Sequence, residues 1–151
     1  KIKHITKDKR LPTETKMRSF NAYTSSLFLY NSETWSMSKA TADSIDSFHR
    51  RMLRSAIDVR WPNKIHVSDT DLYEKKKQKP WSSVITKRRM RLYGCLLRLP
   101  KETPVRLSMR EYKQPLKMAR GARKFTWKKS IENDLERIGV NKADVYDVAQ
   151  D

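Results

Sequence analysis

The 151-residue sequence lacks several features that mark well-known classes of protein. It contains one cysteine, Cys95, so no disulfide can form within the chain, which suits a reducing, intracellular compartment. Its longest apolar run, 27–30, is far shorter than the roughly 20 residues of a membrane-spanning helix. A glycine-rich phosphate loop and the ligand spacing of a zinc site are also missing. We therefore expect no membrane partner, no metal, no cofactor and no small-molecule ligand.

Paired carboxylates that could support catalysis are equally scarce. Two-metal phosphoryl transfer needs acidic side chains that converge on ions about 4 Å apart. The nearest candidates, Asp69 and Asp71, follow Ser68 in a pattern typical of a helix N-terminus, where carboxylates are favourable without any catalytic role. We expect no catalytic residue in this chain.

The histidine and cysteine residues also have structural explanations. His49 lies beside Arg50 and Arg51, and we interpret it as a surface or phosphate-facing residue rather than a base. Cys95 lies near the expected inward face of its helix, which predicts a buried, small apolar side chain rather than a nucleophile.

Positive charge is abundant, and it is concentrated in the middle of the chain. Residues 75–130 contain 19 basic and 2 acidic side chains, whereas 1–74 contain 13 and 9, and 131–151 contain 2 and 6. Such a concentrated field favours a polyanion, because contacts with phosphates release counterions. A surface that is merely solvated would have more acids among its bases. We therefore expect RNA or DNA as the partner.

Two groups of cations are the candidate contacts with phosphate. The first group is Lys87, Arg88, Arg89 and Arg91, and we expect its three arginines to point largely outward from a helix. The second group, in a basic loop, is Lys113, Lys117, Arg120, Arg123 and Lys124. Two tryptophans follow basic runs and could stack on bases. Because Trp81 and Trp127 begin expected helices, a role as core anchors is favoured over stacking.

Apolar side chains recur at three- and four-residue spacing along most of the sequence, which predicts helices. With only three glycines and no alternating runs, a sheet is not expected. We predict an all-α fold of about seven helices in two loosely joined subdomains, 1–79 and 80–151, divided near Pro80. The helices are expected to begin near Thr13, Ser38, Ser68, Ser82, Thr103, Trp127 and Asn141. Met17, Phe20, Tyr23, Leu27 and Tyr30 should share one stripe of the first helix. The predicted core contains Phe20, Leu27, Phe48, Met52, Leu92, Leu96, Ile131 and Leu135.

Five short stretches occur in an order that is typical of one family. They are LYNSETW at 29–35, FHRRMLR at 48–54, IDVRWP at 57–62, KRRMRLYGCLLRLP at 87–100, and Arg-Gly with Thr-Trp within 120–127. Together they resemble the thumb and post-polymerase region of non-LTR (LINE-type) retrotransposon reverse transcriptases. The sequence departs from that pattern at Asn31, at 92–95 and at 122–123, where the family usually has Gly, W-L-G-H and R-P.

The resemblance implies a fragment of a longer RNA-directed DNA polymerase, and the first residue, Lys1 rather than Met, fits an excerpt. The family's catalytic Y-x-D-D motif would lie upstream, and none occurs here. The resemblance implies that 1–79 form a thumb-like segment and that a polymerase domain of the same protein is a partner. It also implies localisation to the nucleus and cytoplasm. It implies non-catalytic gripping of the RNA template or an RNA–DNA hybrid.

Two alternatives remain open. The first is a sequence-specific DNA-binding module whose helix near 82–99 enters a major groove. That helix offers Arg, but no Asn or Gln to read base edges. The second is a basic segment that binds an acidic protein.

Overall fold

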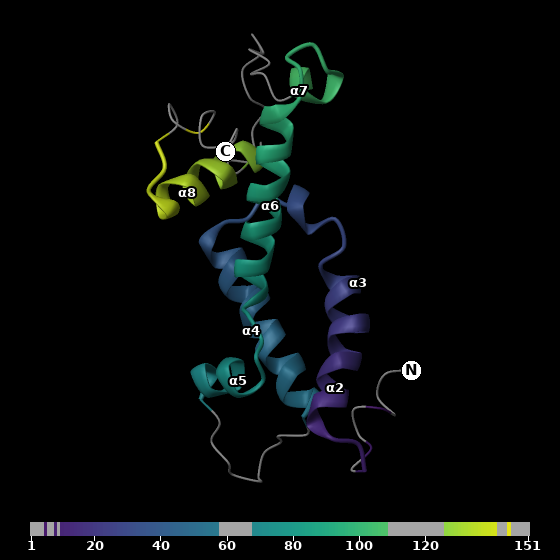
Figure 1. The fold of residues 1–151 in the computed structure, drawn as a ribbon. Coiled ribbons are helices and arrows are strands. Elements are labelled where there is room, and N and C mark those ends of the chain that lie inside the picture. The colour runs from purple at the N-terminus through teal and green to yellow at the C-terminus, as the bar shows by residue number, and fades with distance from the viewer. Residues whose placement is uncertain are drawn as a thin grey trace, which may run out of the picture. The chain divides into compact units, whose positions relative to one another are not determined.

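The computed structural model describes residues 5, 8, 10–57, 68–108, 126–141 and 145, and these residues form helices without a strand. The predicted all-α class is confirmed. If the continuous helical run 13–28 is counted once, the described residues hold six helices (Figure 1). The expected helix that begins near Asn141 falls mostly outside the described residues.

The chain divides into two compact units. Unit 1 comprises Lys1–Ser32 with Lys39–Ile85, and unit 2 comprises Glu33–Ser38 with Thr86–Asp151. The division therefore falls inside a long helix and not at Pro80, and a short segment from early in the sequence joins the later unit.

Unit 1 begins with a helix that changes its pitch. An α-helix, α2 (Thr13–Phe20), continues into a π-helix (Asn21–Ser25) and then into α3 (Ser26–Phe28). The predicted cap, Thr13, is instead the first helical residue, and the N-cap is Pro12, which makes no side-chain hydrogen bond.

The π-helix makes the predicted apolar stripe wrong beyond Phe20. A π turn holds an extra residue, so later side chains are rotated around the helix axis. Three residues of the predicted stripe are exposed, namely Tyr23, Leu27 (74% exposed) and Tyr30. Leu29, which is not part of the predicted stripe, is buried instead. The predicted burial of Leu27 is therefore wrong.

Two further helices belong to unit 1. A 3-10 turn (Ser32–Thr34) precedes α4 (Lys39–Ala56), which is followed by α5 (Asp69–Lys75). The Oγ of Ser68 accepts a hydrogen bond from the backbone N–H of Asp71 at 3.1 Å. The interpretation of this sequence as a helix cap is confirmed.

The core of unit 1 contains a cluster of stacked aromatic rings among aliphatic side chains. The Trp81 ring stacks on the His49 ring with centroids 4.2 Å apart and on the Phe28 ring at 4.3 Å. Phe20 is 1% exposed and also stacks near His49. Trp81 is 2% exposed, so the expectation that it anchors the core is confirmed.

The long helix α6 (Trp81–Arg98) begins in unit 1 and continues into unit 2 (Figure 1). Its first turn is fixed by Asp46, which accepts hydrogen bonds from the backbone N–H and the Oγ of Ser82 at 2.9 and 2.5 Å. The start of this helix thus agrees with the sequence pattern.

Unit 2 continues with α7 (Pro104–Ser108) and α8 (Trp127–Ile138). Proline suits a first helical turn, and α7 begins there as predicted. The Oγ1 of Thr126 accepts a hydrogen bond from the backbone N–H of Lys129. Gly139 ends α8 with a φ of 78°, the left-handed conformation that glycine adopts readily.

The core of unit 2 joins α6 and α8. Ile131, Leu135 and Val145 are buried, and Met90, Tyr93, Leu97, Trp127 and Val140 pack against them. Among the predicted core residues, Phe20, Leu96, Ile131 and Leu135 are buried. Phe48, Met52 and Leu92 are half-buried.

Candidate nucleic-acid interface

One face of α6 carries four cations. Successive side chains of an α-helix are rotated by about 100°, which places Lys87, Arg88, Arg91 and Arg98 within an arc of about 100°. All four side chains are exposed, and α6 contains no acidic residue. We call these four residues the α6 basic stripe. All of them lie in unit 2.

Arg89 lies on the opposite face of the helix, so the prediction that it points outward is wrong. Its side chain is 1% exposed, and its Nε donates a hydrogen bond to the Oδ2 of Asp134 at 2.8 Å. Its Nη1 donates to the backbone oxygen of Trp35 at 2.8 Å. Asp134 is itself buried and also lies near the Oγ1 of Thr86. Arg89 therefore joins the elements of unit 2 and is inaccessible to a phosphate.

The segment Glu33–Ser38 is held against α6 and α8. The Nε1 of Trp127 donates a hydrogen bond to the backbone oxygen of Glu33 at 2.7 Å. The backbone N–H of Met37 donates to the Oγ of Ser130 at 2.9 Å. Together with the bond from Arg89 to Trp35, these contacts fix the position of the segment and bring Glu33 to the cationic helix.

A hollow of about 330 Å³ lies beside the basic stripe. It is lined by Glu33, Arg88, Arg91, Leu92 and Cys95. We call it the α6 hollow. Sequence reasoning missed Glu33, because the contact joins residues that are far apart in the chain.

Cys95 is exposed, so the prediction that it is buried is wrong. Its Sγ lies 3.4 Å from the Nη2 of Arg98. The helical phase explains this, since Cys95 follows Arg91 by four residues and therefore shares the face of the basic stripe.

The second predicted group of cations, 113–124, lies outside the described residues. The described cations nearest to that group in the sequence are Lys128 and Lys129, which are both exposed on α8. The Nζ of Lys129 lies 3.4 Å from the Oε2 of Glu132.

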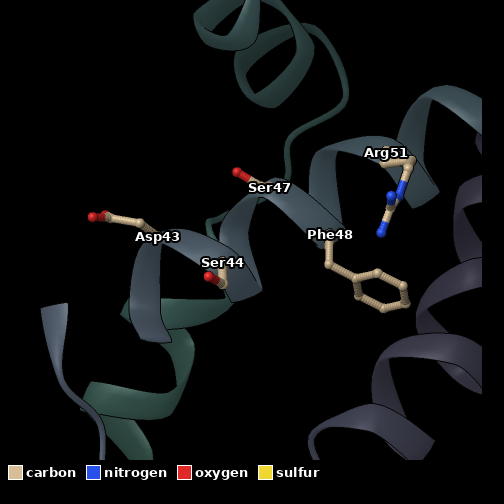
Figure 2. A pocket seen from close by; sticks show the side chains of 5 residues that line it. All are labelled: Asp43, Ser44, Ser47, Phe48 and Arg51. Carbon is tan, nitrogen blue, oxygen red and sulfur yellow. The ribbon is translucent and has the colours of Figure 1, made fainter. Parts of the chain in front are cut away.

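A second hollow, in unit 1, offers no comparable cluster. Its volume is about 390 Å³, and it is lined by Asp43, Ser44, Ser47, Phe48 and Arg51 of α4. Figure 2 shows the guanidinium of Arg51 above the ring of Phe48, at 5.5 Å from its centroid, while the carboxylate of Asp43 points away. The charged groups do not converge, and Arg51 faces a ring of its own chain.

A third hollow, also in unit 1, combines both signs of charge. It has a volume of about 410 Å³ between α2 and residues 76–78, and it includes Lys76 and Lys77. The Nη2 of Arg18 already pairs with the Oε1 of Glu14 at 2.9 Å. Because Arg18 is already paired with Glu14, this hollow is a weaker candidate for phosphate than the α6 basic stripe.

His49 is buried, so the interpretation of it as a surface residue is wrong. Its side chain is 1% exposed, and neither ring nitrogen has a hydrogen-bond partner among the described residues. Burial lowers the pKa of His49 to about 4; nearby Asp46 opposes this shift, and Arg50 adds to it. The imidazole is therefore neutral near pH 7 and cannot hold a phosphate.

Asp69 has a structural role. Its Oδ2 lies 3.0 Å from the Nε of Arg50 in an ion pair, and its Oδ1 accepts a hydrogen bond from the Nη2 of Arg54 at 2.5 Å, which ties the start of α5 to α4. Within the described residues, no three His, Cys, Asp or Glu side chains gather as metal ligands would. The described helices include none whose length and apolarity would suit a membrane crossing.

Comparison with known proteins identifies no relative of this chain. No protein-family model matches the sequence, and no curated protein or solved structure matches it either. The candidate interface therefore stands on its own geometry, and its main parts are the α6 basic stripe and the hollow beside it.

Proposed function

We propose that this chain binds nucleic acid without catalysis and grips the phosphate backbone through the α6 basic stripe. The observation that carries the proposal is the exposure of four cations on one face of a helix that has no acid. This helix lies within 75–130, where bases outnumber acids by 19 to 2. Arginine and lysine in such an array neutralise successive phosphates and release their counterions.

Contacts with the phosphate backbone of the nucleic acid should contribute more to binding than contacts with base edges. The stripe consists of Lys and Arg alone, which suit phosphate oxygens, and it lacks the Asn or Gln that pairs with adenine. An A-form duplex presents mainly its shape, phosphates and 2′-hydroxyls to a protein. Binding through the stripe should therefore depend strongly on salt and weakly on sequence.

The resemblance to LINE-type reverse transcriptases supports a narrower form of the proposal. In that form, the chain grips the RNA template or the RNA–DNA hybrid beside an upstream polymerase domain of the same protein. The parent protein would then be an RNA-directed DNA polymerase that acts in the nucleus and cytoplasm, and this chain would be its accessory, non-catalytic part.

The test is a salt titration of a variant in which Lys87, Arg88, Arg91 and Arg98 are replaced by Gln. Each lost phosphate contact should make the slope of log affinity against log salt shallower by about 0.7 to 0.9, so about three units in total. Arg89 is left intact, because its replacement would test folding instead. Fluorescence anisotropy with several RNA and DNA sequences measures the slopes.

The matched control replaces four exposed cations elsewhere, namely Arg10, Arg18, Lys39 and Arg137. This variant has the same net charge but should retain most of the slope. Equal losses in the two variants would show that charge acts only as a diffuse cloud and would overturn the proposed grip. Loss that is confined to one sequence would favour a base-reading module. Binding of an acidic polypeptide with no binding of RNA or DNA would favour a protein partner.

A further inference from the structure

The volume of the α6 hollow indicates the size of ligand that it could hold. Its volume of about 330 Å³ lies at the lower end of the range of about 300–1,000 Å³ that small-molecule sites occupy. One unpaired nucleotide is of the right order for this space, whereas a duplex keeps the hydrogen-bonding edges of its bases paired.

The lining of the hollow has separate parts for a phosphate and for a base. Arg88 and Arg91 are three residues apart and therefore neighbours on one face of the helix, and a guanidinium matches phosphate oxygens in a bidentate manner. Leu92 and Cys95 supply a weakly polar wall against which the face of a base could lie.

Among the described residues that line the hollow, Glu33 is the one acid. It would repel a phosphate, but a carboxylate accepts hydrogen bonds from the N–H groups of a base. Guanine presents two adjacent donors, N1–H and N2–H, on its Watson–Crick edge, and these match the two oxygens of a carboxylate. The bond from the Nε1 of Trp127 to the backbone oxygen of Glu33 fixes this residue in place.

We propose that the α6 hollow binds one unpaired nucleotide, with its phosphate at Arg88 and Arg91 and its base edge at Glu33, and that it prefers guanine. This inference rests on the proposed function. Taking a paired base out of a duplex costs a few kcal/mol, and an unpaired base avoids that cost. The chain should therefore bind a strand with an unpaired guanosine more tightly than a fully paired duplex.

Cys95 provides a direct probe, because it is the one cysteine in the sequence, is exposed and lines the hollow. Its rate of alkylation by N-ethylmaleimide is measured with three RNA duplexes, each at a saturating concentration. One duplex is fully paired, one has a single bulged guanosine, and one has a single bulged uridine. The bulged guanosine should slow alkylation several-fold, the uridine less, and the paired duplex least.

The role of Glu33 is tested with Glu33→Gln, and Glu102→Gln is the matched control because Glu102 is an exposed acid outside the hollow. If Glu33 accepts from guanine, its replacement should abolish the preference for guanosine over uridine, while the control keeps it. If Glu33 acts only as a nearby negative charge, its replacement would tighten the binding of every RNA equally. That second result would overturn the assigned role.

The outcomes separate this inference from the proposed function. Equal binding of the three duplexes, with equal slowing of Cys95 alkylation by all of them, would overturn the nucleotide site and leave the proposed function intact. An absence of binding to all three would overturn both. Circular dichroism shows that each variant is folded before its result is used.

Discussion

The imidazole of His49 stacks face to face on the ring of Trp81 and lies near the ring of Phe20. Its centroid lies 4.2 Å from that of Trp81 and 6.0 Å from that of Phe20. The adjacent arginines suggest a surface position, but consecutive residues of a helix point in different directions. The better signal is the spacing of His49 with Leu53 and Ala56, the other buried residues of α4, at four and seven positions.

Acid should destabilise the chain through His49. The unfolded ring binds a proton near pH 6.5, whereas the folded ring stays neutral down to about pH 4. Between these values the unfolded state holds more protons, so stability is fully present above pH 6.5 and falls as the pH decreases toward 4. The expected slope is at most about 1.4 kcal/mol per pH unit. Urea unfolding between pH 7.5 and 4.5 measures it.

The variant His49→Phe keeps an aromatic ring in the stack and removes the titrating group. Its unfolding free energy should depend less on pH than that of the parent chain over the same range. An unchanged pH dependence in this variant would show that other groups cause the loss of stability.

At the scale of the element, the first helix departs most clearly from its sequence pattern. Regular periodicity predicts one apolar stripe, but the π-helix Asn21–Ser25 rotates the later residues. The helix ends elsewhere in the chain agree better with their local signals, as Ser68, Pro104 and Gly139 show. Those signals act through hydrogen bonds and dihedral angles of a few adjacent residues.

Two leucines should therefore differ sharply in their contribution to stability. Leu27→Ala should change the unfolding free energy by no more than about 0.5 kcal/mol, as is usual for a surface site. Leu53→Ala should lower it by about 2–5 kcal/mol, because Leu53 of α4 is fully buried. Guanidinium denaturation measures both. A large loss from Leu27→Ala would contradict the exposed position of that side chain.

At the scale of the whole molecule, unit 2 depends on contacts between distant parts of the sequence. Arg89 bonds to Asp134 and to the backbone of Trp35, and Trp127 bonds to the backbone of Glu33. A buried ion pair is expensive to break, because the remaining charge has lost its partner in a dry environment.

Removal of one partner of this pair should cost more than removal of both. Arg89→Met alone should lower the unfolding free energy by about 3–5 kcal/mol, because the Asp134 carboxylate is then buried without its partner. The double variant with Asp134→Leu should recover most of that loss. Chemical denaturation of the two single variants and the double variant gives the coupling energy. Additive losses would argue against a buried, coupled pair.

The sequence by itself determined the helical class, the ends of several helices and the concentration of charge in 75–130. These properties follow from local hydrogen bonding, from side-chain periodicity and from composition. Only the tertiary structure decided that Arg89 is buried while Arg88 and Arg91 remain exposed, that His49 lies in an aromatic stack, and that Glu33 reaches α6. Each of these depends on partners from distant parts of the chain, which no local pattern specifies. Residues of one chemical type, adjacent in the sequence, thus have different roles because folding turns them toward different neighbours.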